Sequence, residues 1–149
     1  MKIIKVDSAN KDFENLCKQL EEYQFDMLPI LKEKNYSLVQ NLQEIFPFVM
    51  YEENLAIGCI GVKRISNESC EIVRVFVDKK YRGKGYALKL FEVAENFAKS
   101  LGYKKAELVV WSAAKPAVAL YKKLGYTFEK ENISEWYGGH KYFECFKKL

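Results

Sequence analysis

The sequence is poor in residues that bind structural metals or rigidify small domains. It contains 149 residues, of which three are proline and one is histidine, and its cysteines include no Cys-x-x-Cys pair. No zinc site is expected, because such a site needs several cysteine or histidine ligands at close spacing. We expect no metal, and we expect the cysteines to be free, buried thiols in a reducing compartment. These are Cys17, Cys59, Cys70 and Cys145.

Long apolar runs are also absent. Even a run such as Leu108–Trp111 is far shorter than the about 20 apolar residues that cross a bilayer as a helix. The opening segment Met1–Asp7 interrupts its apolar residues with lysine and has no small-residue cleavage site, so it does not read as a secretory signal. The expectation is a cytoplasmic protein that has no contact with a membrane.

Charge of one sign does not dominate the sequence. The 24 Lys and Arg residues exceed the 20 Asp and Glu residues by only four, and the two signs are interleaved except in residues 79–84 and at Lys147-Lys148. A nucleic acid partner is therefore not expected, because it would need a broad basic surface. The length, the hydrophobic content of 49% and the lack of any repeat or linker predict a single domain over residues 1–149.

Hydrophobic periodicity predicts the element order β-α-(α)-β-β-β-α-β-α-β-β. This order indicates an α/β fold (α+β mixed), with a mixed, mostly antiparallel, twisted sheet of about seven strands flanked by about four helices. Ser8 or Asn10 would cap the first helix, and Gly58 and Gly61 are expected at bulges or close approaches. The expected strands are 3–6, 46–51, 55–65, 70–77, 106–111, 126–132 and 141–147; the expected helices are 13–23, 87–101 and 116–124, with short irregular helical pieces in 28–42.

The turn between the strand at 70–77 and the following helix has the composition of an anion-binding site. Gly83 and Gly85 can let backbone N–H groups face a phosphate at the positive end of the helix dipole, and four cations lie nearby. The turn is neither a P-loop nor a dinucleotide fingerprint, because no Gly-Lys-Ser/Thr ends it and Leu88 stands where a third glycine would be needed. A basic turn that merely reverses the chain remains the alternative.

A second informative segment is the helix at 116–124, which carries Tyr121 four residues before Gly125. A phenol can donate a proton to a leaving group or hydrogen-bond to it. The alternative is that Tyr121 is an ordinary core residue like Leu120 and Leu124.

Together, these segments resemble the GNAT superfamily of acetyl-CoA-dependent N-acetyltransferases. The pyrophosphate motif of that family is matched by Arg82, Gly85 and Ala87. Its helix motif Leu-Tyr-x-Lys-x-Gly-Phe/Tyr is matched by Leu120, Tyr121, Lys123, Gly125 and Tyr126. The matched stretch runs from residue 71 to residue 128, and the predicted element order extends the resemblance over the whole chain.

The resemblance implies how acetyl-CoA would be held. Backbone groups of Val75, Phe76 and Val77 would contact the pantetheine arm and the acetyl carbonyl. Arg82 would lie beside the pyrophosphate, and Tyr121 would act as the general acid that protonates the departing thiolate. Many family members have Asn where this chain has Ala114, so one polar contact to the cosubstrate is missing. The pyrophosphate itself would be bound by the backbone amides of Gly83, Lys84, Gly85, Tyr86, Ala87 and Leu88.

The general base is less directly indicated. An alkylammonium must lose a proton before it attacks, which calls for a carboxylate or an ordered water. Family members often place Glu on the strand at 70–77, so Glu71 is the candidate, and strand alternation puts it on one face with Val73, Val75 and Val77. An exposed charge beside Arg74 is the alternative. Water or Glu135 would be the next candidate.

The resemblance implies transfer of acetyl from acetyl-CoA to a primary amine of a small molecule, by direct attack in a ternary complex. The alternatives are acetylation of a protein N-terminus or lysine, and a catalytically inactive CoA-binding regulatory module. Acceptor specificity is expected from residues 23–45 and 129–142. Within the second range, residues 136–140 either line the acceptor pocket or form only a long hairpin. A homodimer is left open.

Overall fold

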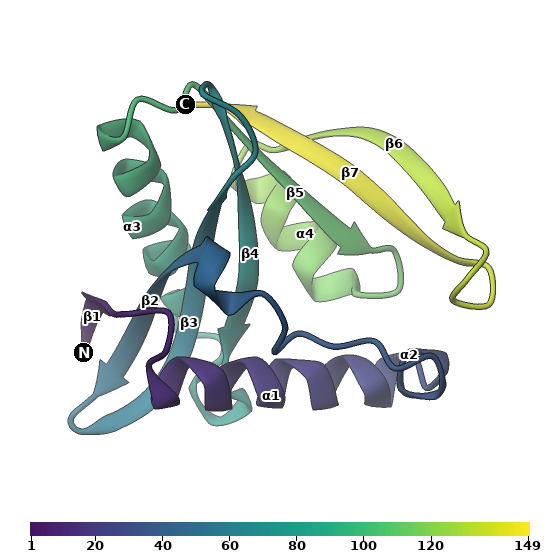
Figure 1. The fold of residues 1–149 in the computed structure, drawn as a ribbon, viewed down its shortest axis with the longest axis horizontal. Helices are drawn as coiled ribbons and strands as arrows, with labels where there is room; N and C mark the ends of the chain where they lie inside the picture. Colours follow the sequence, from purple (N-terminus) through teal and green to yellow (C-terminus); the bar gives the residue numbers. More distant parts are fainter.

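The computed structural model describes residues 1–149, which form one seven-stranded sheet with helices on both faces (Figure 1). The strand order is β1-β2-β3-β4-β5-β7-β6, and β4 and β5 are the parallel pair in an otherwise antiparallel sheet. This confirms the predicted mixed, mostly antiparallel architecture. The strands are β1 (Lys2–Lys5), β2 (Ile45–Glu52), β3 (Leu55–Arg64), β4 (Ser69–Val77), β5 (Lys105–Trp111), β6 (Thr127–Ser134) and β7 (His140–Lys148).

The helices also follow the predicted order. Of the two proposed caps for α1, Asn10 is the one used, since its side chain accepts a hydrogen bond from the Phe13 N–H at 3.0 Å. The weakly patterned stretch contains a one-turn helix and a short 3-10 turn, as expected after Pro29. No helix combines the length and the apolar character needed to cross a bilayer. The helices are α1 (Lys11–Met27), α2 (Ile30–Glu33), α3 (Tyr86–Ser100) and α4 (Lys115–Lys123), with 3-10 turns η1 (Leu42–Glu44) and η2 (Lys79–Tyr81).

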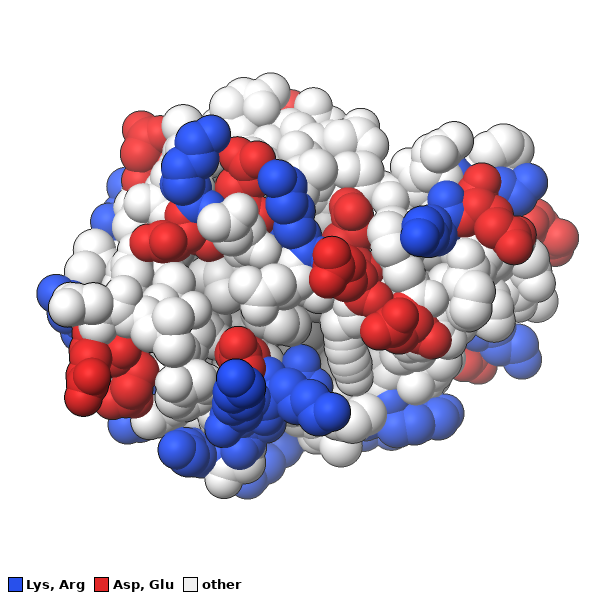
Figure 2. All heavy atoms as spheres, turned by 90° about the horizontal axis from the view of Figure 1, so that it is seen from below, with Lys and Arg blue, Asp and Glu red and all other residues white.

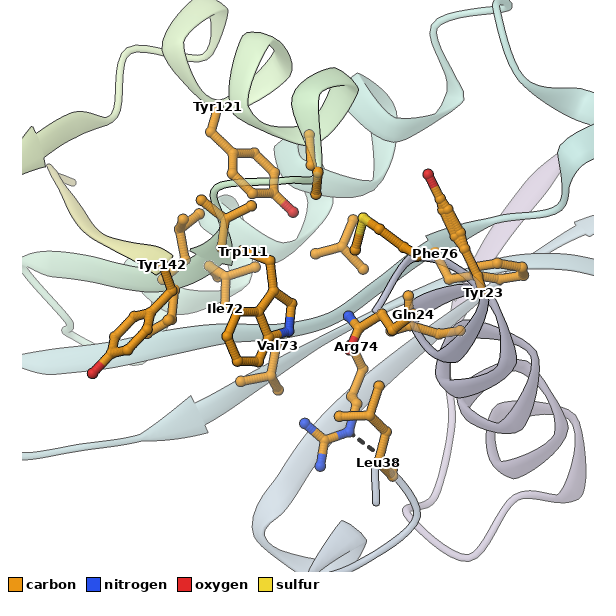
Figure 3. Close-up of a pocket in the computed structure, with 18 of the residues that line it drawn as sticks. Tyr23, Gln24, Leu38, Ile72, Val73, Arg74, Phe76, Trp111, Tyr121 and Tyr142 are labelled. Carbon is orange, nitrogen blue, oxygen red and sulfur yellow. Dashed lines mark hydrogen bonds between the residues drawn. The ribbon is translucent and has the colours of Figure 1, made fainter. Parts of the chain in front are cut away.

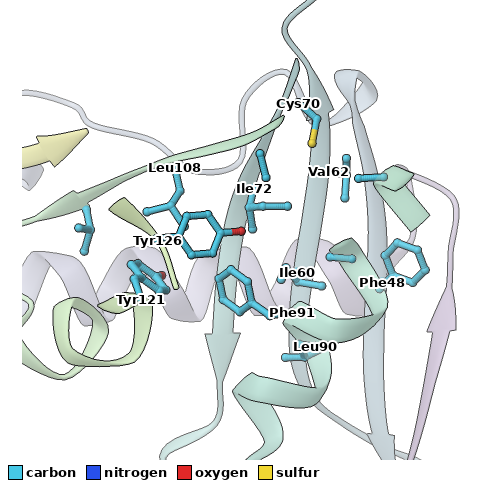
Figure 4. Packing of buried hydrophobic residues seen from close by; sticks show 14 of the residues in the cluster. Phe48, Ile60, Val62, Cys70, Ile72, Leu90, Phe91, Leu108, Tyr121 and Tyr126 are labelled. Carbon is cyan, nitrogen blue, oxygen red and sulfur yellow. The ribbon is translucent and has the colours of Figure 1, made fainter. Parts of the chain in front are cut away.

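Strand alternation divides the core between the two faces of the sheet. Val49 and Cys59 point toward α1, whereas their neighbours Met50 and Ile60 point toward α3. The larger cluster lies on the α3 side, where Phe91 packs with one tyrosine of α4 and with another that directly precedes β6 (Figure 4). Full burial of a side chain such as Phe91 contributes roughly 1.5–3 kcal/mol, so this layer provides much of the stability of the fold.

All four cysteines are buried and free, as the sequence predicted. Burial raises the pKa of the Cys70 and Cys145 thiols to about 11. These two thiols therefore remain protonated at neutral pH and behave as small hydrophobic side chains.

The sheet opens between β4 and β5. These strands are paired only where Ser69, Cys70 and Glu71 meet Lys105–Glu107. Beyond Glu71 they diverge, and β5 continues instead along β7 (Figure 1). The opening leaves residues 72–77 of β4 without a strand partner on that side.

A bulge in β4 accompanies the divergence. Val73 is opposite Gly61 and Phe76 is opposite Cys59, so two residues of β4 lie opposite one residue of β3. Arg74, within the bulge, has a φ of 56°, a value that non-glycine residues seldom adopt. The extra residue reverses the alternation of the side chains beyond it.

The bulge makes one sequence prediction wrong. Glu71, Val73, Val75 and Val77 do not share a face, because Val73 packs in the α1 cluster whereas Val75 and Val77 pack in the α3 cluster. The predicted close approaches in β3 are confirmed. A Cβ at Gly58 would lie 2.8 Å from the Phe76 carbonyl oxygen, and one at Gly61 would collide with Ile45.

Candidate functional site

A cavity of about 650 Å³ occupies the opening between β4 and β5. Its wall is mostly apolar and comes from α1, the loop after α2, β4, β5, α4 and the β6–β7 hairpin. Figure 3 shows side chains from these separate segments converging on the same space. The cavity is large enough to admit a small molecule together with part of a second one.

The unpaired stretch of β4 forms one wall of this cavity. Val75, Phe76 and Val77 all line it, and none has a partner on β5. An open strand edge of this kind presents backbone N–H and C=O groups that an extended ligand can use as a strand would.

The turn after β4 ends at the N-terminus of α3 and is shaped for an anion. Gly83 and Gly85 have φ values of 79° and 76°, so both residues use the left-handed conformation that glycine adopts without strain. Gly85 caps the helix with no side-chain hydrogen bond, and the backbone N–H groups from Gly83 to Leu88 donate to no other group of the protein. These donors lie at the positive end of the helix dipole.

Space is available for a ligand at this turn. A Cβ built on Gly83 or Gly85 would meet no atom within 4 Å. The turn predicted to bind an anion is therefore a backbone cradle with open space beside its glycines, and free N–H groups at a helix N-terminus are the kind of donor that binds phosphate groups.

The side chains of the turn point to other partners. The Arg82 guanidinium donates from Nε to the Val77 carbonyl oxygen at 2.9 Å and lies over the Tyr23 ring. The Tyr86 hydroxyl donates to Glu52 at 2.9 Å, and the Lys84 ammonium lies over the Tyr81 ring. Within this turn, the groups free to bind an anion are mainly backbone N–H groups.

Tyr121 reaches the cavity from α4 (Figure 3). Its ring packs against Phe91 and Tyr126 in the core, with centroid distances of 5.4 and 6.4 Å. Burial raises the pKa of the Tyr121 phenol, so the hydroxyl is protonated at neutral pH. The ring belongs to the core, as the alternative reading expects, and the residue also lines the cavity, where a proton donor would have to lie. Ala114 lines the same cavity.

Glu71 lies where β4 and β5 begin to separate, and it also lines the cavity. Burial raises the pKa of its carboxyl group, and the Glu107 carboxylate, opposite Glu71 in the β4–β5 register, acts in the same direction. Lys63 and Arg74 oppose the shift without cancelling it. A carboxylate whose pKa is raised toward neutrality is better suited to accept a proton.

An aromatic cluster closes the far end of the cavity. Tyr36, Trp111 and Tyr137 contact one another edge to face, with centroid distances of 5.5 to 6.3 Å. Tyr137 belongs to the hairpin between β6 and β7, so this segment both forms a hairpin and lines the cavity. Trp136, by contrast, is 65% exposed and stacks with Lys34.

Arg74 is a site residue whose orientation the sequence did not reveal. Its Nε donates to the Leu38 carbonyl oxygen at 2.9 Å, and the Leu38 N–H in turn donates to Glu21 at 2.7 Å. The Leu38 peptide therefore ties the loop after α2 to both β4 and α1. An arginine interrupting an apolar strand was the only available signal, and periodicity alone could not predict the bulge that orients it.

The structure brings most of the predicted site residues together. Tyr121, Glu71, Val75–Val77, Arg82 and Ala87 line one cavity, and the remaining residues of the turn at 83–88 adjoin Arg82 and Ala87 in the chain. Figure 2 shows the lower face of Figure 1, where charges of both signs are interspersed and basic side chains gather along one edge.

Comparisons with known proteins agree with this geometry. The sequence model of the acetyltransferase (GNAT) family matches residues 10–126. The chain is 36% identical over 83 residues to an uncharacterized N-acetyltransferase of Methanocaldococcus jannaschii, a match that covers 55% of this chain and 36% of that protein. It is 28% identical over 107 residues to an uncharacterized N-acetyltransferase of Escherichia coli K12, covering 63% of this chain and 64% of that protein. It thus spans less than two thirds of either relative.

Solved structures share the fold over nearly the whole chain. The PaiA N-acetyltransferase from Thermoplasma acidophilum, solved in complex with coenzyme A, superposes with a TM-score of 0.78 at 20% identity, covering 99% of this chain and 98% of that one. Because the family match spans most of the sequence and the fold agrees, the chain belongs to the acetyltransferase (GNAT) family.

Proposed function

We propose that the protein transfers the acetyl group of acetyl-CoA to a primary amine of a small molecule, by direct attack in a ternary complex. The observation that carries the proposal is the continuity of the site. An anion cradle at the N-terminus of α3 adjoins an open strand edge, which leads into a cavity lined by Tyr121 and Glu71.

The cosubstrate would follow this sequence of features. Backbone N–H groups from Gly83 to Leu88 would bind the pyrophosphate. The edge of β4 at Val75–Val77, where the Val77 carbonyl already accepts from Arg82, would bind the amide-containing arm through its remaining groups. This arrangement directs the thioester toward Tyr121. Many members of the family have Asn where this chain has Ala114, so binding of the cosubstrate would depend more heavily on the backbone donors.

Proton transfer would be divided between two side chains. The amine nitrogen bonds to the acetyl carbon, the carbon–sulfur bond breaks, and the electron pair leaves on sulfur. Tyr121 donates its phenolic proton to that sulfur. The surrounding apolar wall raises the phenol pKa, and it also raises the proton affinity of the thiolate formed beside it.

On the acceptor side, Glu71 would take a proton from the bound ammonium, directly or through one water. Burial raises the pKa of this carboxyl group, which makes its carboxylate a stronger base. As the tetrahedral intermediate collapses, the nitrogen releases its second proton to solvent, the tyrosinate regains a proton from solvent, and Glu71 releases the proton it took. The complete reaction consumes an ammonium and acetyl-CoA and yields the acetamide, CoA and one proton.

The size of the cavity favours a small acceptor over a protein substrate. The Leu38 peptide ties the loop after α2 to Arg74, and Tyr36 of that loop contacts Tyr137 of the β6–β7 hairpin, so these segments form a continuous wall at the acceptor end. A protein tail or lysine would need this end to be open. A CoA-binding regulatory module would need no general acid, yet Tyr121 is present.

A thiol-release assay tests the proposal. Purified protein would be incubated with acetyl-CoA and separate panels of amino acids, polyamines, aminoglycosides and short peptides, and the acetylated product identified by mass. Release of CoA with a small amine supports the proposal, and release only with peptides would favour the protein-acetylating alternative. Stabilisation by acetyl-CoA without release in any panel would favour the regulatory module.

A further inference from the structure

Arg74 is a cation without an acidic partner in the acceptor half of the cavity. It is only partly accessible, its one side-chain hydrogen bond in the structure joins Nε to the Leu38 carbonyl oxygen, and no carboxylate lies within ion-pair distance. A guanidinium has five N–H donors. The hydrogen bond to Leu38 therefore fixes the orientation of the group and leaves the two Nη atoms free to bind a ligand.

The surroundings make an unpaired charge here costly. Removing a charged group from water is unfavourable unless hydrogen bonds or an opposite charge compensate for it. The backbone adds to this cost, because the φ of 56° at Arg74 is strained for a residue with a Cβ. Strain and an unpaired charge at the same residue are typical of positions that are used for binding.

A second recess adjoins the main cavity at this point. It has a volume of about 270 Å³ and a mostly polar lining, and Glu71, Val73 and Arg74 belong to both spaces. Ser37, Gln40 and Asn41 contribute other polar side chains, and the Lys63 ammonium of the recess already pairs with Glu44 at 3.3 Å. The junction therefore offers one unpaired cation beside a polar space, next to an apolar cavity.

Figure 3 shows how Arg74 relates to the proposed chemistry. The Tyr121 ring lies on the α4 side of the cavity, and the Arg74 guanidinium lies on the opposite side, next to Leu38. Between them stand the apolar side chains Ile72 and Val73 and the Trp111 ring. An acceptor that reaches both ends needs an amine near Tyr121, an apolar body and an anionic group at Arg74.

We propose that Arg74 binds a carboxylate of the acceptor, so that the preferred substrate carries its primary amine and its carboxylate at opposite ends of an apolar body, as an ω-amino acid does. This inference rests on the proposed acetyl transfer and specifies its acceptor. Carboxylate is the anion that the planar guanidinium fork matches with two parallel hydrogen bonds. The apolar wall accommodates the body between the two charged groups, and Glu71 is available to the ammonium.

The test compares amines that share an apolar body and differ only in the anionic group. 6-Aminohexanoic acid, 6-aminohexanamide and pentylamine form one such set, and 8-aminooctanoic acid, 8-aminooctanamide and heptylamine form another. Acetylation would be followed by CoA release, and binding to the protein saturated with CoA would be followed by calorimetry. We expect kcat/KM and affinity to favour the free acid by roughly 10- to 100-fold over the amide.

Two variants connect the preference to Arg74. Arg74→Asn removes the guanidinium, and Asn tolerates the left-handed backbone, so the preference for the free acid should fall to near unity, beyond any loss that acid and amide share from releasing Leu38. Arg74→Lys keeps the charge without the fork and should give an intermediate preference. Arg64→Asn is the matched control, because Arg64 is exposed, bonds to Asn67 and does not line the cavity.

The outcomes separate this inference from the proposed function. Equal binding and turnover of acid and amide would overturn the carboxylate assignment even if acetyl transfer is efficient. A loss in Arg74→Asn that is equal for both substrates would also overturn it, because the residue would then only hold the loop at Leu38. Preferential binding of the acid without CoA release would support the assignment and contradict the acetyltransferase proposal.

Discussion

The two ends of the cavity are built in different ways. At the α3 end, a few consecutive residues form the cradle, and its donors are backbone N–H groups. At the acceptor end, side chains arrive from α1, the loop after α2, the bulge of β4 and the β6–β7 hairpin. A backbone cradle should tolerate changes of side chain and fail when its conformation or charge is changed, whereas the acceptor end should respond to single side chains.

The largest expected effect comes from Gly85→Glu, which places a side chain and a negative charge at the cradle. It should abolish stabilisation by acetyl-CoA, measured as the shift in melting temperature. The control is Gly102→Glu at the other end of α3, where φ is 91° and a Cβ would likewise meet nothing within 4 Å. Both variants should lose about 1–2 kcal/mol of stability from the left-handed backbone. Retained stabilisation in Gly85→Glu would contradict the cradle.

The next effect concerns the hydroxyl of Tyr121. Tyr121→Phe keeps the ring that packs on Phe91 and removes only the O–H, so kcat should fall by roughly 10²-fold while acetyl-CoA affinity is unchanged. Tyr126→Phe is the control. It removes a hydroxyl that donates to Glu95 at 2.8 Å, so it should lower stability and leave kcat intact. Equal turnover in Tyr121→Phe and wild type would leave this residue a purely structural role.

Glu71→Gln tests the base through pH dependence. If Glu71 accepts the proton, the acidic limb of kcat/KM should flatten or move upward in the variant, with acetyl-CoA binding unchanged. Glu107→Gln is the companion, because removing the neighbouring charge should lower the pKa of Glu71 and move the limb to lower pH. A wild-type profile in both variants would point to water or Glu135 instead.

Glu71 also gives a prediction for how the stability of the fold depends on pH. Because the folded state raises the pKa of Glu71, its contribution to stability is full below the ordinary Glu pKa and declines as pH rises through the folded-state value. Glu71→Gln should therefore be more stable than wild type at pH 7, and the advantage should shrink toward pH 4. Thermal unfolding across that range measures it, and a constant difference would contradict the burial argument.

The smallest effect is expected at Lys84. Its ammonium is exposed and lies over the Tyr81 ring, so Lys84→Gln removes only a screened charge near the cradle. Acetyl-CoA affinity should weaken by no more than about fivefold, and the difference should vanish at high salt. A loss as large as that of Gly85→Glu would mean that side chains, not backbone donors, bind the pyrophosphate.

Local patterns predicted the cradle and the element order. The conformation of the turn was predictable because it depends on consecutive residues, namely glycines that permit left-handed backbone directly before a helix N-terminus. The helix carrying Tyr121 was predictable for a similar reason, since its apolar spacing and terminal Gly125 are contiguous. The ends of helices and strands differed from their predicted positions by a few residues at most where the hydrophobic pattern was strong. Helix α1 extended furthest beyond its predicted range.

The β4 bulge shows where local patterns fail. The alternation of Glu71, Val73, Val75 and Val77 predicts one face, yet the extra residue at Arg74 moves Val75 and Val77 to the other. Nothing in the strand sequence identifies the bulge, because it depends on pairing with β3 and on the divergence from β5.

The sequence by itself determined the secondary-structure order, the cradle for an anion and the positions of Tyr121 and Glu71, since each follows from residues close together in the chain. Only the tertiary structure decided which face each side chain occupies beyond Arg74, and that Tyr36, Trp111 and Tyr137 meet around one cavity. The physical reason is the distance along the chain over which each interaction acts. Backbone conformation and helix dipoles act over a few residues, whereas strand register and cavity walls arise from contacts between segments that the chain itself keeps far apart.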